Sequence, residues 1–250
     1  MEERKVAVVT AAAGAGIGGA VARRLAADGM IVVITDAHER RCREVAEQLS
    51  AEHGREMPGI PLDVTDPEAV ERTMREAHER LGRIDVLVNN AGWAKLQLVA
   101  EMDLENWRHT IDVDLNGTFY CLRYALPFMI ERRSGAVVNI SSTAAWEAGT
   151  HHGAYAAAKA AVCALTRAAA SEVGSSGIRV NAIAPGLIYN EFLRRIYPEE
   201  FFDTAVERTM VGRVGQPEDV AALVSFLVSD AAGYITGEVY GISGGESPHA

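Results

Sequence analysis

Short apolar runs alternate along the chain with longer segments in which apolar residues recur at helical spacing. Helical spacing predicts helices at residues 16–28, 39–53, 67–81, 104–131, 153–174 and 217–229. The apolar runs predict buried strands at residues 5–10, 31–35, 59–62, 84–88, 136–140, 179–183 and 238–242. Strands flanked by helices form a parallel sheet with both faces covered, joined by right-handed crossovers. The pattern therefore predicts an α/β fold built on one doubly wound parallel sheet.

No internal repeat or low-complexity linker divides this pattern. A length of 250 residues with 48% hydrophobic residues suits one large domain, residues 1–250, better than two small ones. The alternation of strands and helices is interrupted at residues 187–212. We therefore expect a single α/β domain that carries one long insertion near its C-terminal end.

Charge and composition exclude several classes of protein and site. A net charge of −10 argues against a nucleic-acid partner, and no run approaches the roughly 18 apolar residues of a membrane helix. Cys42, Cys121 and Cys163 are odd in number, far apart and outside any C-x-x-C motif, which indicates a reducing cytoplasm without disulfides. The seven histidines include the pair His151 and His152 but no cluster at ligand spacing, so we expect no metal site.

The first predicted strand runs into small residues, VVTAAAGAGIGGA at 8–20. A secretory signal is one interpretation, but acidic residues precede the apolar stretch and four glycines interrupt it. An ordinary glycine-rich turn is the second. The third is a cradle in which glycines let the backbone approach a pyrophosphate at a helix N-terminus. Gly14, Gly16 and Gly19 fit G-x-G-x-x-G, and a doubly wound sheet receives the pyrophosphate at its first strand-to-helix turn, so we favour the cradle.

Asp36 closes the second predicted strand, about 20 residues after the glycines, where an acidic residue accepts hydrogen bonds from the adenosine ribose. The alternative is that Asp36 caps the following helix. A carboxylate here would repel a ribose 2′-phosphate, which favours NAD(H) over NADP(H). Arg40 and Arg41 are the counter-evidence, because an arginine can clamp that phosphate.

With these motifs in place, the chain resembles a short-chain dehydrogenase/reductase along nearly its whole length. The resemblance rests on Gly16-Ile17-Gly18, Asp63-Val64, NNAG at 89–92, Ser142, Tyr155 with Lys159, and RVNAIAPG at 179–186, all in the family's order. It implies a Rossmann-type fold, a nicotinamide cofactor and an alcohol/ketone oxidoreductase. It also implies a homo-oligomer, a dimer or tetramer, formed through helices 104–131 and 153–174 and the C-terminal strand.

The resemblance implies contacts along the whole cofactor. Asp63 is expected at the adenine edge, and Pro185 with Gly186 beside the nicotinamide. Asn190 stands where many relatives place a threonine on the carboxamide, and it can both donate and accept. The expected cofactor-binding residues are Thr10, Gly14, Gly16, Ile17, Gly18, Asp36, Asp63, Val64, Asn90, Ala91, Gly92, Tyr155, Lys159, Pro185, Gly186, Ile188 and Asn190.

The glycine loop departs from the family. Residues 10–18 number nine where the family has eight, and Ala11 or Ala12 stands at the usual first glycine, depending on the alignment. Because alanine resists a left-handed conformation, we expect the extra residue and Gly14 to reroute the turn. Gly16 and Gly18 are intact, so the phosphate-facing end is expected to survive.

The catalytic candidates follow from residue types and spacing. Tyr155 and Lys159 are four apart, so on a helix they share one face. A tyrosine is a poor base because its unperturbed pKa is about 10, but a nearby ammonium favours the phenolate. Tyr155 is then a proton donor and acceptor for a carbonyl/alcohol pair, and Ser142 holds the substrate oxygen in preference to Ser141. The alternative is an amphipathic surface pair without a catalytic role.

Asp114 is a further catalytic candidate, and here the chain departs from the family again. The family places an asparagine three residues before the glycine that is Gly117 here, where it kinks the helix and binds a water linked to the catalytic lysine. Asn116 lies two positions late. An ionised Asp114 can only accept, so we expect it to serve as the acceptor half of this relay, and to attract Lys159 and weaken its hold on the phenolate. The alternative is an aspartate turned to solvent.

Substrate identity rests on the insertion at 187–212, which closes over the substrate in the family. Its apolar residues, and Trp93, Trp146 and the two adjacent histidines, suit a hydrophobic acyl or alicyclic group; those in the insertion are Phe192, Ile196, Tyr197, Phe201 and Phe202. Ser171 and Ser176 stand where reductases that act on acyl carrier protein offer arginines. We therefore favour a coenzyme A thioester or a free cyclic alcohol.

The glycine loop and the DxHERR run also resemble a group of actinobacterial dehydrogenases that act on hydroxyacyl-CoA intermediates of sterol-ring breakdown. Two alternatives stay open: a sugar or polyol dehydrogenase of the same family, and a catalytically silent dinucleotide-sensing protein. Intact Ser142, Tyr155 and Lys159 favour an enzyme, because a sensor needs no activated phenol.

Overall fold

One sheet organises the computed structural model, which describes residues 4–190 and 198–248. Its seven strands are all parallel and lie in the order β3-β2-β1-β4-β5-β6-β7. They are β1 (Val6–Val9), β2 (Ile31–Asp36), β3 (Gly59–Pro61), β4 (Val86–Asn89), β5 (Gly135–Ile140), β6 (Ile178–Pro185) and β7 (Val239–Ile242). The strand order reverses between β1 and β4, which places a ligand-binding crevice at their carboxyl ends. The predicted fold is confirmed.

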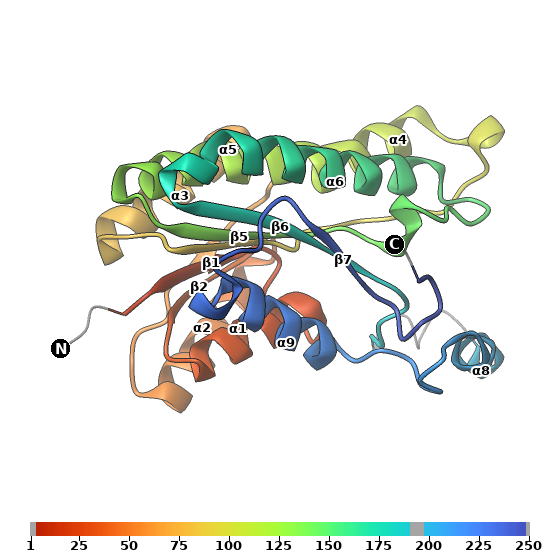
Figure 1. The fold of residues 1–250 in the computed structure, drawn as a ribbon, viewed down its shortest axis with the longest axis horizontal. Helices are drawn as coiled ribbons and strands as arrows, with labels where there is room; N and C mark the ends of the chain where they lie inside the picture. The colour runs from red at the N-terminus through yellow and green to blue at the C-terminus, as the bar shows by residue number, and fades with distance from the viewer. Residues whose placement is uncertain (1–3, 191–197, 249–250) are drawn as a thin grey trace.

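Two layers of helices cover the sheet (Figure 1). One layer holds α1 (Ile17–Ala27), α2 (Glu39–His53) and α9 (Pro217–Val228), and the other holds α3 (Pro67–Leu81), α5 (Gly117–Arg132) and α6 (Gly153–Val173). Helix α4 (Leu104–Ile111) lies at the end of the second layer. Within the part of the chain that the structure describes, no helix is long and apolar enough to cross a membrane.

The core is split into two apolar clusters, one on each face of the sheet. Successive residues of β1 point to opposite faces, so Ala7 and Val9 join the cluster under α1, α2 and α9, while Val6 and Val8 join the cluster under α3, α5 and α6. Both sets are buried. This is why the strands appear in the sequence as continuous apolar runs rather than as alternating patterns.

The predicted helix at residues 104–131 is interrupted. A π-helical segment, η2 (Asp112–Asn116), separates α4 from α5. Its sequence DVDLN contains residues of low helix propensity, and the π turn brings Asp114 into the interior. The structure also contains a helix that the apolar pattern did not predict, α8 (Glu199–Arg208), inside the insertion at 187–212.

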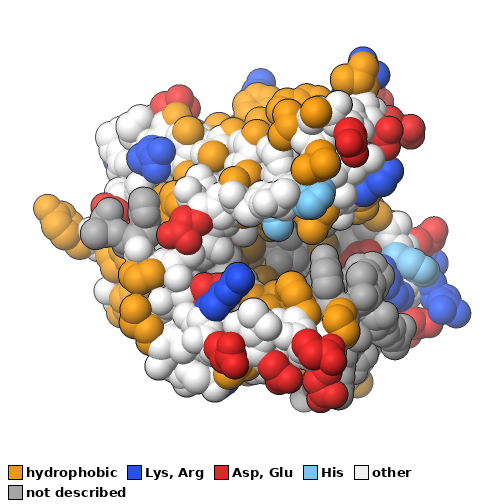
Figure 2. Space-filling view, turned by 90° about the vertical axis from the view of Figure 1, so that its right-hand side faces the viewer, with side chains coloured by type: hydrophobic (Ala, Val, Ile, Leu, Met, Phe, Trp, Pro, Cys, Tyr) orange, Lys and Arg blue, Asp and Glu red, His pale blue; other side chains and the backbone are white. Residues whose placement is uncertain are grey.

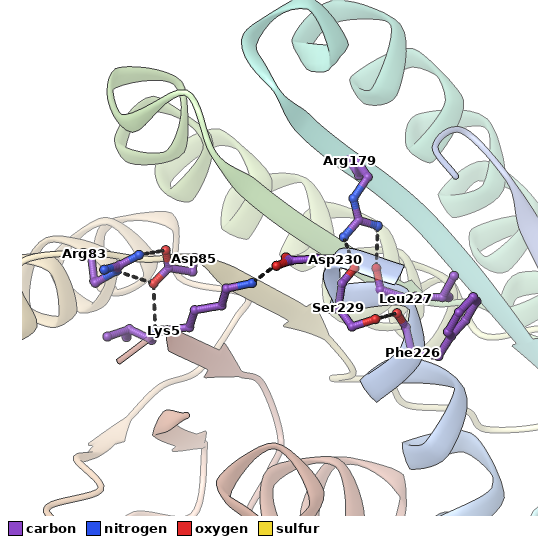
Figure 3. Close-up of polar contacts among 9 residues, drawn as sticks. Lys5, Arg83, Asp85, Arg179, Phe226, Leu227, Ser229 and Asp230 are labelled. Atoms are coloured by element: carbon purple, nitrogen blue, oxygen red, sulfur yellow. Dashed lines mark hydrogen bonds and ion pairs between the residues drawn. The ribbon is translucent and has the colours of Figure 1, made fainter. Parts of the chain in front are cut away.

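Hydrogen bonds and ion pairs of charged side chains join the amino ends of the strands (Figure 3). Asp85 accepts hydrogen bonds from the backbone of Val6, at 2.8 Å, and from Arg83, at 2.6 Å. Lys5 pairs with Asp230 at 2.8 Å. These contacts join β1 to the start of β4 and to the segment before β7.

Arg179, in β6, ends helix α9 at the same edge (Figure 3). Its guanidinium donates to the carbonyls of Leu227, at 2.5 Å, and Ser229, at 3.0 Å, which lie at the C-terminus of the helix. Burial lowers the pKa of Arg179 from its ordinary value. A cavity of about 370 Å³ at this edge is therefore bordered by charges already engaged in structural contacts.

Candidate active site

A cleft of about 520 Å³ opens at the carboxyl ends of the strands, at the opposite edge from the charged pairs described above. Figure 2 looks onto this edge and shows a hollow near the centre of the face, with hydrophobic side chains above and below it. Its lining comes from the loops after β1, β4, β5 and β6 and from helix α6. The lining residues are Ala11, Gly14, Gly16, Ile17, Gly18, Asn90, Gly92, Trp93, Ala94, Ile140, Ser141, Ser142, Tyr155, Lys159, Pro185, Gly186, Leu187, Ile188, Tyr189 and Asn190.

The glycine loop turns at an alanine. Ala11 has φ +51°, in the left-handed region, so the expectation that the turn would be rerouted to avoid a left-handed alanine is wrong. The strained residue is held on both sides: its carbonyl accepts from Asn90 Nδ2 at 3.2 Å, and the next amide, of Ala12, donates to the carbonyl of Thr35 at 2.8 Å. Neighbouring contacts thus offset the roughly 1–2 kcal/mol that a left-handed residue costs.

Gly18 and Gly19 are required where the loop meets helix α1. A Cβ on Gly18 would lie 2.3 Å from the carbonyl oxygen of Ala11, and one on Gly19 would lie 1.9 Å from that of Gly14. Helix α1 begins without a side-chain cap and has no acidic residue in its first turn. Its first N–H groups are therefore available to an anion, and no carboxylate competes for them.

Thr10 and Asn90 join the loop after β1 to the loop after β4, where the strand order of the sheet reverses. The Thr10 hydroxyl accepts from the backbone N–H groups of Asn90, at 2.8 Å, and Ala91, at 2.9 Å, while Asn90 Nδ2 donates to the carbonyl of Thr10 at 3.0 Å. Thr10 is 1% exposed, and neither it nor Ala91 lines the cleft. The buried Thr10 hydroxyl therefore holds the two loops together and does not face the cleft.

Asp36 is engaged at the end of β2. Its Oδ2 accepts from the backbone of Ala13 at 3.3 Å, its Oδ1 accepts from the backbone of His38 at 2.9 Å, and Arg41 lies 3.6 Å away. Helix α2 has His38 as its N-cap residue, so the interpretation of Asp36 as the cap is wrong. The carboxylate instead joins β2 to the glycine loop.

Asp63 and Val64 follow β3 and lie outside the cleft lining. Asp63 is exposed and accepts from the backbone and hydroxyl of Thr65, at 2.9 and 2.8 Å. Val64 is buried against Gly117, where a Cβ would come within 2.7 Å of Val64 Cγ2. The described contacts of these two residues are therefore with the protein itself.

Ser142, Tyr155 and Lys159 meet on one wall of the cleft. Ser142 directly follows β5, and its Oγ accepts from the backbone of Ala144 at 3.1 Å. Tyr155 and Lys159 share a face of α6, with Nζ 5.5 Å from the centre of the phenol ring. Lys159 is 3% exposed, so the alternative of a surface pair is wrong.

Ser141 borders the cleft, but its hydroxyl is bonded in the interior. It is 2% exposed, and its hydroxyl donates to the carbonyl of Lys159 at 2.9 Å and lies 3.1 Å from Cys163 Sγ. The hydroxyl of Ser141 therefore fixes helix α6 to β5, while that of the adjacent Ser142 lies at the cleft.

Asp114 is fully buried, so the alternative of an aspartate turned to solvent is wrong. Its Oδ1 lies 2.8 Å from Lys159 Nζ, and its Oδ2 accepts from the backbone N–H of Trp93 at 3.0 Å. Asn116, two positions later, donates instead to Asp112 at 2.7 Å. Burial pushes the pKa of Lys159 down, but attraction to Asp114 and Tyr155 outweighs it, and the pKa is raised.

The segment after β6 forms the wall opposite the glycine loop. Asn190 Nδ2 lies 3.6 Å from the position that a Cβ on Gly16 would take. The base of the segment is pinned by Gly215, which donates to the carbonyl of Leu187 at 3.1 Å and accepts from the backbone of Tyr189 at 2.7 Å. These bonds fix the position of the segment on the far side of the cleft.

Part of the expected substrate wall can be placed. Phe202, in α8, lies 6.5 Å from the Tyr189 ring, and its ring meets that of Phe201 edge to face at 5.4 Å. Phe192, Ile196 and Tyr197, the other aromatic and aliphatic residues expected in this wall, lie outside the described residues.

Trp93 lines the cleft, with its ring edge-on to His109 at 4.6 Å. Trp146, His151 and His152 do not line it; Trp146 packs against Gly241. Leu187 and Tyr189 are lining residues that sequence reasoning missed, although they flank the predicted Ile188. Within residues 4–190 and 198–248, no group of three His, Cys, Asp or Glu side chains could hold a metal ion.

Comparison with known proteins places this site in a family. A family model described as enoyl-(acyl carrier protein) reductase matches residues 11–247. The (5R,7aS)-5-hydroxy-7a-methyl-1-oxo-2,3,5,6,7,7a-hexahydro-1H-indene-carboxyl-CoA reductase of Mycobacterium tuberculosis is 42% identical, over 96% of this chain and 92% of its own. The cis-4-hydroxycyclohexanecarboxylate dehydrogenase of Sinomonas cyclohexanicum is 41% identical, over 96% of each chain.

The fold agrees with the sequence relatives. The crystal structure of gox2181 matches with a TM-score of 0.93 at 34% identity, covering 98% of this chain and 96% of that one. The resemblance drawn from the motifs is confirmed. The chain belongs to the short-chain dehydrogenase/reductase family, whose members are oxidoreductases that interconvert alcohols and ketones with a nicotinamide cofactor.

Proposed function

We propose that the chain interconverts a secondary alcohol and a ketone on a hydrophobic cyclic or acyl skeleton, as a coenzyme A thioester or a free alicyclic compound, with NAD(H). The observation that carries the proposal is the meeting of Ser142, Tyr155 and Lys159 on one wall of a cleft that the glycine loop also lines. A small-molecule substrate fits between them.

The residues present fit a dinucleotide. The loop offers Gly14, Gly16 and Gly18 to the cleft, with no side chain to block a pyrophosphate, and the start of α1 offers uncapped N–H groups. Asn190, across from Gly16, is proposed to hold the carboxamide, and Pro185 with the residues after it to border the nicotinamide. The bound cofactor supplies the hydride chemistry.

We assign the proton chemistry to the chain itself. The phenol of Tyr155 donates a proton to the substrate oxygen in reduction and takes it back in oxidation. The Ser142 hydroxyl holds that oxygen by a hydrogen bond. The ammonium of Lys159, fixed by the carbonyl of Ile140 at 3.0 Å, stabilises the phenolate that the proton transfer leaves.

NAD(H) is the proposed cofactor, with NADP(H) the weaker candidate. The Asp36 carboxylate lies beside the glycine loop, where it would accept from ribose hydroxyls and repel a 2′-phosphate. The two arginines that could counter this repulsion are both engaged: Arg40 lies 3.6 Å from Glu44 and Arg41 lies 3.6 Å from Asp36.

Apolar side chains support a hydrophobic substrate. Trp93, Leu187 and Tyr189 line the cleft next to the catalytic wall, and Phe202 packs near Tyr189. The two relatives named above act, by their names, on a CoA-linked bicyclic compound and on a cyclohexane carboxylate. A sugar would leave this apolar wall without a partner, which disfavours the polyol alternative.

We also propose a homo-oligomer. Helices α5 and α6 border an apolar hollow of about 340 Å³ on the outer surface, and Phe119 and Ile130 there are 45% and 42% exposed. Side chains of this kind on neighbouring helices suit a second copy of the chain. All three cysteines are buried and free, which supports the proposal of a reducing cytoplasm.

A turnover screen tests the proposed function. NADH and NADPH are offered with 3-oxoacyl-CoA, cyclic ketone and sugar substrates, and absorbance at the nicotinamide band is followed. We expect turnover with a CoA-linked or cyclic ketone. Tight NADH binding, seen by fluorescence, without turnover of any of these substrates would instead support the dinucleotide-sensing alternative.

A further inference from the structure

A carboxylate is buried behind the wall that carries Ser142, Tyr155 and Lys159, at a position where the family resemblance implies an asparagine. Asp114 is 0% exposed and Lys159 is 3% exposed, and their charged atoms lie 2.8 Å apart. Gly92 closes over the pair, because a Cβ there would come within 3.1 Å of Asp114 Oδ1 and 3.4 Å of Lys159 Nζ. The loop after β4 thus covers the carboxylate side of the ion pair, while Lys159 borders the cleft.

Each atom of this pair has a fixed neighbour. Lys159 Nζ donates to the carbonyl of Ile140 at 3.0 Å, and Asp114 Oδ2 accepts from the backbone of Trp93 at 3.0 Å. The π-helical turn that carries Asp114 is itself held by Thr118, whose hydroxyl donates to the Asp114 carbonyl at 2.8 Å. The carboxylate cannot swing away without leaving a buried lysine charge unpaired, which is costly.

The charge of Asp114 reaches Tyr155 through Lys159. A lone ammonium 5.5 Å from the phenol ring would stabilise the phenolate, because burial of Lys159 weakens the screening of its charge. A carboxylate in contact with that ammonium cancels most of its field. The ion pair therefore stabilises the phenolate less than a lysine beside a neutral asparagine would.

The other titratable groups around the pair do not replace this effect. Cys163, one turn along α6, contributes to the field at Lys159 and lies against Ser141. His109, from α4, faces the Trp93 ring rather than the ion pair. The raised pKa of Lys159 keeps it an ammonium, so the group that faces Tyr155 is an intact ion pair.

We propose that Asp114 is a positioning residue that neutralises Lys159 and thereby keeps the Tyr155 phenol protonated at neutral pH. This inference rests on the proposed function, and it predicts fast ketone reduction near neutral pH and alcohol oxidation that needs alkaline conditions. A phenol that keeps its proton is ready to break its O–H bond toward a substrate oxygen. The relay water predicted from the sequence is a separate role, which stays a prediction.

Ultraviolet difference titration tests the proposal without turnover. The phenolate band is followed from pH 6 to 11 in the NAD⁺ complex of the wild type, Asp114→Asn, and each of these combined with Tyr155→Phe. Subtracting the Tyr155→Phe curves isolates Tyr155 from the other six tyrosines of the seven in the chain. We expect the Asn variant to ionise Tyr155 about one pH unit or more below the wild type.

Two variants control for structure. Asp112→Asn removes the neighbouring carboxylate of the same π segment, which bonds Asn116 and not Lys159, and should leave the Tyr155 midpoint unchanged. Asp114→Glu keeps the charge and should stay near the wild-type midpoint. An Asp114→Asn midpoint equal to the wild type would overturn the proposal, as would an equal downward shift in Asp112→Asn.

The wild type alone provides a second test, should Asp114→Asn fail to fold. A Tyr155 midpoint of about pH 9 or above, close to an ordinary tyrosine, supports the proposal, and one below about pH 9 contradicts it. Absence of turnover with every substrate would count against the proposed function, whereas the absorbance titration would still report on the ion pair. The two failures are therefore distinguishable.

Discussion

Asp36 and Ala13 are joined by a hydrogen bond, with Oδ2 of the carboxylate 3.3 Å from the backbone nitrogen. The bond ties the carboxyl end of β2 to the glycine loop after β1, and it leaves the side chain 12% exposed. A negative charge is therefore fixed beside the loop that we propose as the pyrophosphate cradle.

This geometry predicts that kcat/KM with NADH exceeds that with NADPH by at least about tenfold, because like charges brought together cost several kcal/mol. Asp36→Ser should narrow or reverse the ratio. Glu39→Gln, which removes an exposed carboxylate paired with Arg43 on the same helix, should leave it unchanged. Equal efficiency with both cofactors in the wild type would contradict the assignment.

The hydrogen bonds of Thr10, between the loops after β1 and β4, predict an effect on stability. Thr10→Val removes the hydroxyl that accepts from two backbone N–H groups, of Asn90 and Ala91, and should lower the free energy of unfolding by about 1–3 kcal/mol. Thr204→Val is the matched control, because its hydroxyl bonds a helical carbonyl at an exposed site. Urea denaturation measures the free energy of unfolding of both variants. Equal losses would show that the Thr10 hydroxyl stabilises the protein no more than an exposed helical hydroxyl does.

The apolar face on α5 and α6 predicts an interface between copies of the chain. Phe119→Arg places a charge in that face and should shift the protein toward monomers in analytical ultracentrifugation. Val99→Arg, at another exposed apolar residue, should leave the mass of the assembly in solution unchanged. A monomeric wild type at micromolar concentration would dismiss this interface.

The cysteines predict slow chemical labelling. Burial raises the pKa of Cys42 to about 11 and that of Cys121 to about 12, so both are protonated at pH 8, and the thiolate is the reactive form. Cys163 is buried as well. Labelling with a chromogenic disulfide should therefore follow global unfolding in urea. Rapid reaction of a thiol in the native protein would show that the helix packing opens locally.

The strands were predictable because both faces of the sheet are covered. β1, for example, appears as a run of buried apolar residues that no amphipathic helix would show, and the ends of β1 and β6 differ from the predicted ones by one or two residues. That the chain forms one domain stays a prediction, since it is a statement about independent folding.

Two elements, η2 and α8, were not predicted from the sequence. Helical periodicity indicates which face of a helix is apolar, but it does not show which backbone hydrogen bonds form. The η2 segment keeps apolar residues near helical spacing, so its π geometry does not appear in the pattern. Helix α8 carried a usable signal, with Pro198 before it and Glu199 and Glu200 in its first turn, but its aromatic residues suggested a lid instead.

The candidate site was predictable where a motif fixes a residue and unpredictable where a partner comes from elsewhere in the fold. The spacing of Tyr155 and Lys159 placed both on one wall, because α6 is regular across them. No local pattern could show that Ala11 takes a left-handed conformation. The attraction of Asp114 to Lys159 was expected from the family resemblance, but the π-helical segment η2 that carries Asp114 was not.

The central claim, that Tyr155 is the proton donor of an alcohol/ketone oxidoreductase, is tested most directly by turnover of Tyr155→Phe. The variant keeps the ring and its packing on α6 but loses the hydroxyl, so cofactor affinity should stay within the error of a fluorescence titration. We predict that kcat with the best ketone found in the substrate screen falls by at least about a hundredfold, the scale of general acid–base catalysis. A kcat within a few-fold of the wild type, with the same cofactor affinity, would contradict the account.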